Sequence, residues 1–263
     1  MKLSITQPLL CIFSLPLLAV AQSIDQTSTY SPVQTTGLPY TINLKSADLG
    51  GINLPTLQSY AYGTYDGEWV FVDGRTSGLH LFTADGKVNF PPKAQNTFIW
   101  VVDPVTKQSW SRSLTNSDLS ASQISALSAT APEFAKNGNK LYVAGGYLYD
   151  SSSNNFTTYP TLTALDLTGV VDWVKNATSP LSTSIQQTTN AAVQVTGGSM
   201  NFVNSNNVLL TFGQDFEGPY TAGANGTYTE QIRSFSISDG VGGAGHHEHF
   251  CQPSSGRIPP QRS

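Results

Sequence analysis

The chain has few charged residues. Its 13 Lys and Arg and 17 Asp and Glu make up 11% of 263 residues and leave a formal net charge of −4, whereas charged residues are roughly 25% of an average soluble protein. No basic run is present, so we expect no nucleic-acid partner. The polarity comes from Ser, Thr and Asn, with 23 Gly and 15 Pro. This composition argues against a helical bundle and favours many short strands joined by turns.

Long hydrophobic runs are also scarce, and the one in this sequence lies at the N-terminus. Lys2 gives a positive start, residues 9–20 (LLCIFSLPLLAV) form an apolar core, and Ala19-Val20-Ala21 is an A-x-A cleavage site. The run is shorter than the ~20 residues of a transmembrane helix. We therefore expect residues 1–21 to be a signal peptide and the protein to be secreted, with no membrane contact after cleavage.

Cysteine occurs only as Cys11 and Cys251. Cleavage after Ala21 would remove Cys11, so the mature chain could form no intrachain disulfide. Cys251 could instead join two chains. Three N-x-[ST] sequons, at Asn155, Asn176 and Asn225, would carry glycans in a eukaryotic source.

Residues 22–56 are rich in Ser, Thr and Pro and have no clear periodicity. They form either a linker or a segment with one strand near residues 40–44 (YTINL). The tail, residues 240–263, is rich in Gly, Ser and Pro, and we expect it to be disordered. It contains His246, His247, His249 and Cys251 but lacks the HExxH spacing, so we expect no built metal site.

Three segments between these ends follow one scheme: a short strand with an aromatic residue, a turn, an apolar strand and a glycine. They are YAYGTYDGEWVFVDGR (60–75), EFAKNGNKLYVAGGY (133–147) and MNFVNSNNVLLTFGQ (200–214). The closing glycines, Gly74, Gly146 and Gly213, are 72 and 67 residues apart. The Asp-Gly at 66–67 and the Asn-Gly at 137–138 predict hairpin turns, because type I′ geometry needs positive φ at both central positions.

A third strand is predicted after each glycine, and it gives nearly the same period. The segments are NTFIWVVD (96–103), PTLTALD (160–166) and EQIRSFSI (230–237), which align at spacings of 63 and 70 residues. Asp103 and Asp166 each precede a tryptophan, Trp110 or Trp173, by seven residues, and we expect these aspartates to fix turns. Each unit thus predicts a four-stranded antiparallel sheet of the propeller-blade kind, at 57–114, 115–177 and 178–239.

Two stretches interrupt the pattern. Residues 117–130 place Ser120 and Gln123 at capping-box spacing and predict a short helix between two sheets. Residues 168–176 (TGVVDWVKN) are either a turn and strand or one to two helical turns. If they are helical, the spacing of Trp173 from Asp166 is a coincidence.

The motifs YVAGGY (142–147) and VVDPVTKQSW (101–110) resemble the kelch-type β-propeller superfamily, which includes the central domain of galactose oxidase. The double glycine is intact only in the second unit. The resemblance implies an all-β fold of about three kelch-like blades. Propellers close with roughly four to eight blades, so we expect a truncated form of a longer propeller, or completion by a second copy through unpaired blade edges.

The activity of galactose oxidase itself does not carry over. Its copper-radical chemistry needs a cysteine beside tyrosines and histidines, but residues 57–239 contain no cysteine and His80 is their only histidine. No nucleophile elbow, P-loop or dinucleotide fingerprint occurs either. We therefore expect no cofactor.

The loops that follow the second strand of each unit form the candidate binding surface. They contain Arg75, His80, Tyr149, Asp150, Gln214, Asp215, Glu217 and Tyr220. Aromatic rings beside carboxylates and amides suit a sugar or a peptide. We expect a non-catalytic module that binds an extracellular carbohydrate or protein. The alternatives are a propeller-type enzyme acting on a sugar and a truncated product without independent activity.

The signal-peptide prediction is tested by the mass of the secreted protein. Intact-mass analysis of material collected from the medium should place Gln22 at the N-terminus. Recovery of the chain in a membrane fraction with Met1 retained would contradict the prediction.

Overall fold

The computed structural model describes residues 40, 42–45, 49–224, 226–237 and 256–257. Contacts divide the chain into a unit that ends at Asp48 and a unit that begins at Leu49. In the first unit, residues 42–45 have no regular secondary structure, so the described part of the YTINL segment is not a strand. The sheets, hairpins and helices belong to the second unit.

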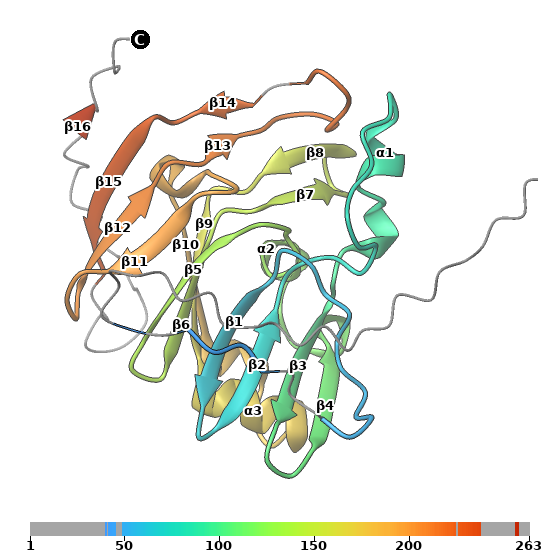
Figure 1. The fold of residues 1–263 in the computed structure, drawn as a ribbon, viewed down its shortest axis with the longest axis vertical. Coiled ribbons are helices and arrows are strands. Elements are labelled where there is room, and N and C mark those ends of the chain that lie inside the picture. The colour runs from blue at the N-terminus through green and yellow to red at the C-terminus, as the bar shows by residue number, and fades with distance from the viewer. Residues whose placement is uncertain (1–39, 41, 46–48, 225, 238–255, 258–263) are drawn as a thin grey trace, which may run out of the picture. The chain divides into compact units, whose positions relative to one another are not determined.

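The second unit contains three four-stranded antiparallel sheets (Figure 1). The first is β1 (Ala61–Tyr65), β2 (Glu68–Val72), β3 (Phe98–Asp103) and β4 (Gln108–Ser113). The second is β5 (Glu133–Asn137), β6 (Lys140–Ala144), β9 (Thr161–Asp166) and β10 (Ile185–Thr189). The third is β11 (Ser199–Phe202), β12 (Asn207–Thr211), β15 (Gln231–Ser236) and β16 (Gly256–Arg257). In each sheet, strands pair in chain order, so the expected all-β class is confirmed.

Two hairpins and three short helices complete the described elements. The hairpins are β7 (Tyr147–Asp150) with β8 (Asn155–Thr158), and β13 (Gln214–Asp215) with β14 (Thr227–Tyr228). The helices are α1 (Gly86–Asn89), α2 (Ala121–Ala126) and α3 (Leu167–Lys175), and 3-10 turns lie at η1 (Pro92–Ala94), η2 (Leu114–Asn116), η3 (Leu181–Ser184) and η4 (Ala191–Val193). Both hairpins and α1 gather at one end of the sheets, and α3 lies at the other end (Figure 1).

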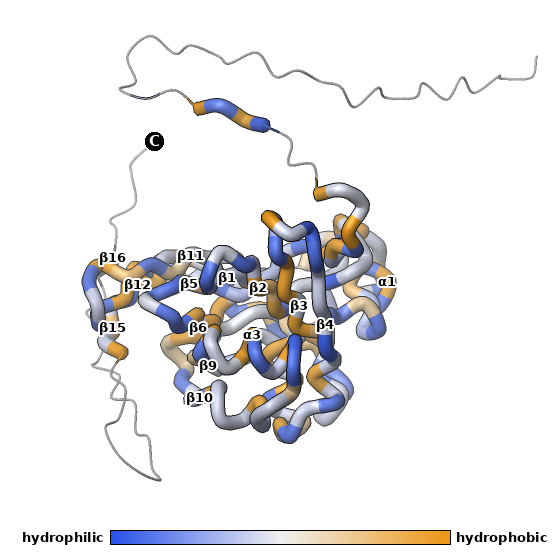
Figure 2. The backbone as a smooth tube through the Cα atoms, turned by 90° about the horizontal axis from the view of Figure 1, so that it is seen from below, coloured by the Kyte–Doolittle hydropathy of each residue, from blue (hydrophilic) through white to orange (hydrophobic). Residues whose placement is uncertain are grey.

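The second sheet is buried on both faces because it lies between the other two. In β6, Leu141 and Val143 belong to the core shared with the first sheet, whereas Tyr142 and Ala144 belong to the core shared with the third. This double burial explains the unbroken apolar sequence of that strand. By contrast, β4 at the edge of the first sheet is largely hydrophilic beside the hydrophobic β2 and β3 (Figure 2).

The same backbone pairing recurs once in each sheet unit. The residue that follows the closing glycine bridges the segment before the first strand: Arg75 pairs with Gln58, Tyr147 with Thr130, and Gln214 with Thr196. Each pair exchanges two N–H···O bonds of 2.8–3.0 Å. The three pairs are separated along the chain by nearly the same intervals as the closing glycines. The sequence period therefore corresponds to a repeated three-dimensional contact.

The residue before each closing glycine also has positive φ, although only one of the three is glycine. Asp73, Gly145 and Phe212 have φ of 62°, 67° and 58°. A Cβ at Gly145 would overlap the carbonyl oxygen of Val195, so only glycine fits there. Asp73 tolerates the conformation with its side chain accepting a hydrogen bond from the Ala129 N–H at 3.0 Å.

The predicted boundary between the second and third units is wrong, because residues 167–175 are helical. The Asp166 side chain caps α3 by accepting from the Thr168 N–H at 3.0 Å. Leu167, Val170, Val171 and Val174 are buried on α3 at helical spacing. The fourth strand of the second sheet is instead β10, and the spacing between Asp166 and Trp173 is a coincidence.

The predicted helix between the first two sheets is confirmed as α2. The Ser120 hydroxyl accepts from the Gln123 N–H, and the Gln123 side chain accepts from the Ser120 N–H, which completes the capping box. The predicted turn at Asp66 and Gly67 is also confirmed, with positive φ at both residues. In the second hairpin Asn137 pairs with Lys140, so Gly138 and Asn139 are the central residues and the prediction is wrong by one position.

Two residues of the expected disordered tail are described, and they form β16. Gly256 and Arg257 pair with Ile232 and Gln231 of β15 as the fourth strand of the third sheet. The prediction for the tail did not include this strand. The remaining tail residues, His246, His247, His249 and Cys251 among them, lie outside the described residues.

The strain at Phe212 leads to a stability prediction. A left-handed conformation costs a non-glycine residue about 1–2 kcal/mol, and glycine in its place loses roughly 0.5–1 kcal/mol of chain entropy. Because the Phe212 ring is half exposed, Phe212→Gly should leave the free energy of unfolding unchanged or raise it by up to about 1 kcal/mol. Chemical denaturation measures this change. The matched variant Phe212→Ala keeps the strain and should be less stable than Phe212→Gly; the reverse order would contradict the argument.

Candidate functional site

Aromatic side chains from the loops of all three sheet units meet at the end that carries the hairpins. His80 stacks on Phe90 with ring centroids 4.9 Å apart and meets the edge of Tyr220 at 5.1 Å. Phe90 contacts Tyr147 at 5.3 Å, and Tyr147 contacts Phe216 at 5.5 Å. These five residues come from the first, second and third units, so the cluster exists only in the folded chain.

A cavity of about 170 Å³ lies among these rings. Equivalent positions of the three units line it: Arg75, Tyr147 and Gln214, which follow the closing glycines, and Ser59, Ala131 and Gly197, which precede the first strands. Loop residues His80, Phe90, Phe216 and Tyr220 complete the aromatic side of the lining. The repeated backbone contact therefore places one side chain of each unit around a common space.

Arg75 is the one arginine among the residues that line this cavity, and it is only 6% exposed. Its Nε donates to the Gly78 carbonyl and its Nη2 to Gln58 Oε1, each at 2.8 Å. Its guanidinium lies 4.8 Å from the centre of the Phe90 ring. Burial lowers the pKa of Arg75, and these neutral contacts hold its side chain in place.

Two hydrogen-bonded groups fix the loops around the cavity. The Tyr147 hydroxyl donates to the Gly218 carbonyl at 2.8 Å and accepts from the Tyr220 N–H at 3.0 Å. Burial raises the pKa of Tyr147, so its hydroxyl stays neutral. The Asn89 amide at the end of α1 donates to the Tyr220 carbonyl at 2.7 Å. Tyr220 thus belongs to the third unit but is positioned by the first two.

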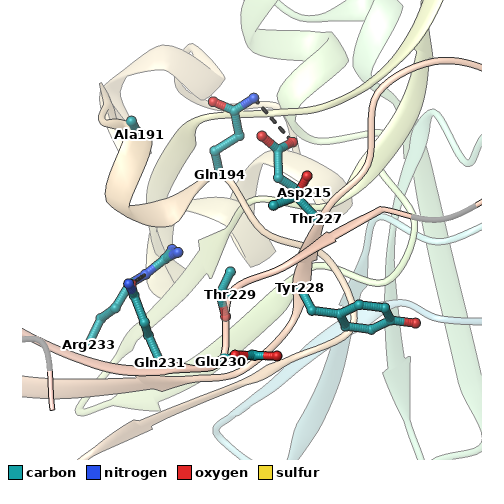
Figure 3. A pocket seen from close by; sticks show the side chains of 9 residues that line it. All are labelled: Ala191, Gln194, Asp215, Thr227, Tyr228, Thr229, Glu230, Gln231 and Arg233. Carbon is teal, nitrogen blue, oxygen red and sulfur yellow. Dashed lines mark hydrogen bonds between the residues drawn. The ribbon is translucent and has the colours of Figure 1, made fainter. Parts of the chain in front are cut away.

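A second, more polar cavity of about 470 Å³ is lined by Asp215 of β13 together with Gln194 and Arg233 (Figure 3). Gln214 and Asp215 are neighbours in this strand, and their side chains point to opposite sides: Gln214 lines the aromatic cavity and Asp215 the polar one. Gln194 Nε2 donates to Asp215 Oδ1 at 3.3 Å. Across the polar cavity, Arg233 Nη1 donates to the Ala192 carbonyl at 2.6 Å.

Gln194 Nε2 donates to Asp215 Oδ1 and to Glu217 Oε1, each at 3.3 Å. The two carboxyl groups therefore lie close together. Burial raises the pKa of Asp215, and the charge of Glu217 raises it further. Glu217 also accepts from the Thr157 hydroxyl at 2.7 Å, which ties the third unit to β8. The exposed Glu217 lines neither of these two cavities.

Two buried carboxyl groups connect successive sheets. Asp73 of the first unit accepts from the Ala129 N–H of the second at 3.0 Å, and Glu133 of the second accepts from the Gly198 N–H of the third at 2.5 Å. The other oxygen of each is buried with no hydrogen-bond partner in the described part of the chain. Burial raises the pKa of Asp73 well above its ordinary value and that of Glu133 to about 8.

The structure divides the predicted binding residues into several groups. Arg75, His80, Gln214 and Tyr220 line the aromatic cavity, and Tyr149 lies beside it against Phe156. Asp150 instead stabilises the β7–β8 turn: burial would raise its pKa, but hydrogen bonds from Ser152 and Ser153 lower it.

Of the two aspartates assigned to turns, Asp103 has that role, whereas Asp166 caps helix α3. Asp103 accepts from the Val105 and Thr106 N–H groups at 2.8 and 3.0 Å, and hydrogen bonds from Thr106 lower its pKa. Of the sequon asparagines, Asn155 and Asn176 are exposed, and Asn225 lies outside the described residues.

Sequence reasoning missed several residues of the two cavities. Phe216 could have been predicted, because it lies in the sequence between the predicted loop residues Asp215 and Glu217. Phe90 and Thr130 gave no signal, since only tertiary packing brings them to Arg75 and Tyr147. Arg233 was treated as part of a strand and not as a cavity residue.

Within the described ranges, no group of three or more His, Cys, Asp and Glu side chains could hold a metal ion. No described helix combines the length and hydrophobicity needed to cross a membrane. Compared with models of protein families, the chain matches none, and no curated protein matches it either.

The raised pKa of Glu133 predicts a pH-dependent stability. Between its ordinary pKa of 4.5 and about 8, the folded state holds a proton that the unfolded state has released, so stability falls as pH rises through this window. Glu133→Gln should therefore unfold at a higher temperature than the unmodified protein at pH 8 and at a similar temperature at pH 4.

Thermal unfolding from pH 4 to 9 measures this effect. The exposed Glu230 provides the control, and Glu230→Gln should follow the unmodified protein throughout. If the unfolding temperature of Glu133→Gln changes with pH in parallel with those of Glu230→Gln and the unmodified protein, Glu133 does not titrate in this window.

Proposed function

We propose that the protein is a secreted, kelch-like propeller module that binds an extracellular carbohydrate, without catalysis, in the aromatic cavity. The observation that carries this proposal is the convergence of side chains from three sheet units on one small space. Arg75, Tyr147 and Gln214 come from equivalent positions, and loop rings from the first and third units border them. Successive blades of a propeller bring equivalent loops to one face around the axis.

The chemistry of the lining supports a sugar ligand. Sugar rings present apolar C–H faces and hydroxyl edges, and binding sites commonly combine aromatic walls with a few fixed polar groups. Here Phe90, Phe216 and Tyr220 supply aromatic surface, and Gln214 and Arg75 supply polar groups. No Asp or Glu is among the described residues that line the cavity, which favours binding over acid–base catalysis at this site.

The contacts between sheets support the propeller part of the proposal. The first strands β1, β5 and β11 are neighbours in that order, and each sheet meanders outward from its first strand. That arrangement is typical of blades around an axis. A protein ligand at the same face, and a chain without independent activity, are the competing outcomes of the binding experiment.

A sugar-converting enzyme is the second candidate, and the Asp215–Glu217 pair is the observation that favours it. Glycosidases use one carboxyl with a raised pKa as the acid and a second as the nucleophile or base. Asp215 has a raised pKa and lies within reach of Glu217. Hydrolysis of a glycan ligand that is lost in Asp215→Asn would identify this second function.

Carbohydrate binding is tested on a glycan array with variants of Tyr220. Tyr220→Ala removes one aromatic wall of the cavity. It should weaken the binding of those glycans that the unmodified protein binds on the array by roughly tenfold, since aromatic contacts contribute up to about 1.5 kcal/mol beyond their buried area. Tyr228→Ala is the matched control, because Tyr228 is an exposed tyrosine of the same unit that does not line the aromatic cavity. If the unmodified protein binds no glycan on the array, or if both variants lose affinity equally, carbohydrate binding in the aromatic cavity is refuted.

A further inference from the structure

Arg75 is a buried cation whose described partners are all uncharged. Its hydrogen bonds end on a backbone carbonyl and an amide oxygen, and its flat face meets the Phe90 ring. No hydrogen bond from Nη1 is found in the described part of the chain. Burying a guanidinium away from water is costly unless an anion or several acceptors compensate it. Within the described structure no anion pairs with Arg75, and Nη1 is not among the buried atoms without a partner.

The other arginine beside a cavity shows the contrast. Arg233 lies in the field of two carboxyl groups, Asp215 and Glu133. Arg75 has no such group: the described lining of the aromatic cavity contains neither Asp nor Glu, and His80 is its other basic side chain. This cavity is therefore electropositive, although the whole chain carries a net charge of −4.

A second buried group in the same cavity also lacks a partner. The Thr130 hydroxyl is buried, and its oxygen makes no hydrogen bond in the described part of the chain. Thr130 and Arg75 line the cavity together. The Tyr147 hydroxyl cannot serve a ligand equally well, because it already donates to Gly218 and accepts from the Tyr220 N–H. Arg75 is therefore the donor of this lining that a bound group could engage, and Thr130 beside it has a buried hydroxyl without a partner in the described structure.

We propose that the aromatic cavity binds an acidic sugar, a uronate, whose carboxylate pairs with Arg75 while its ring lies against the aromatic walls. This inference rests on the proposed carbohydrate function and specifies its ligand class. A guanidinium binds a carboxylate through parallel N–H···O bonds that fix orientation as well as charge.

Calorimetric titration of the whole secreted chain compares three probes: methyl glucuronide, methyl glucoside and glucose 6-sulfate. We expect the glucuronide to bind roughly 10- to 100-fold more tightly than the neutral glucoside, in line with hydrogen bonds to charged groups. Equal affinities of glucuronide and glucoside would overturn the carboxylate assignment. Binding of the sulfate without the glucuronide would overturn it as well.

Variants then assign the effect to Arg75. Arg75→Gln should remove the preference for glucuronide over glucoside, and Arg75→Lys should keep only part of it, because a lysine loses the paired geometry. Arg112→Gln is the matched control, since Arg112 packs on Trp173 away from the cavity. The comparison of probes on the unmodified protein stands even if Arg75→Gln fails to fold. A preference that survives in folded Arg75→Gln would refute the role of Arg75.

The outcomes separate this inference from the proposed function. If glucuronide and glucoside bind equally and Tyr220→Ala weakens both, carbohydrate binding stands and the acidic specificity fails. If glucuronide binding depends on Arg75 but not on Tyr220, the acidic site stands and the aromatic platform fails. If none of the three probes binds, the acidic-sugar inference fails, and the glycan array decides the proposed function.

Discussion

The described structure depends on one backbone contact that joins each sheet unit to the next. The closing glycine of a unit donates its N–H to a carbonyl of the following unit: Gly74 to Ala129 at 2.6 Å and Gly146 to Val195 at 2.8 Å. Positive φ at both glycines aims the N–H outward. Because the contact is between backbones, it recurs with different side chains around it, and the three units keep the same arrangement while their sequences diverge.

Two further features follow from that contact. It holds the second sheet between its neighbours, so β6 and β9 are buried on both faces and the apolar cores of the unit form on either side of them. It also brings the residue after each glycine to a common place. Arg75, Tyr147 and Gln214 are a cation, an aromatic ring and an amide at equivalent positions. A binding site with chemically different walls thus arises from a repeated scaffold.

Six acidic residues of the described units serve three separate purposes. Asp103 and Asp150 accept from backbone N–H groups and stabilise turns. Asp73 and Glu133 lie between sheets, where burial raises their pKa and an unpaired oxygen remains. Asp215 and Glu217 both accept a hydrogen bond from the Gln194 amide beside β13. None of these groups lines the aromatic cavity, so its electropositive character is compatible with an acidic chain.

The sequence by itself determined the all-β class, the repeat period and the capping-box helix α2, because alternation, Gly turns and the spacing of Ser120 and Gln123 act locally. It also pointed to Arg75, His80, Gln214 and Tyr220, since loops after equivalent strands emerge at one end. Only the tertiary structure decided that residues 167–175 form a helix between two sheets and that Phe90 and Thr130 join the cavity. It also decided that Asp150 stabilises a turn and that Asp215 lines the polar cavity and not the aromatic one. Burial and partner choice decide these roles, and both depend on residues far away in the sequence.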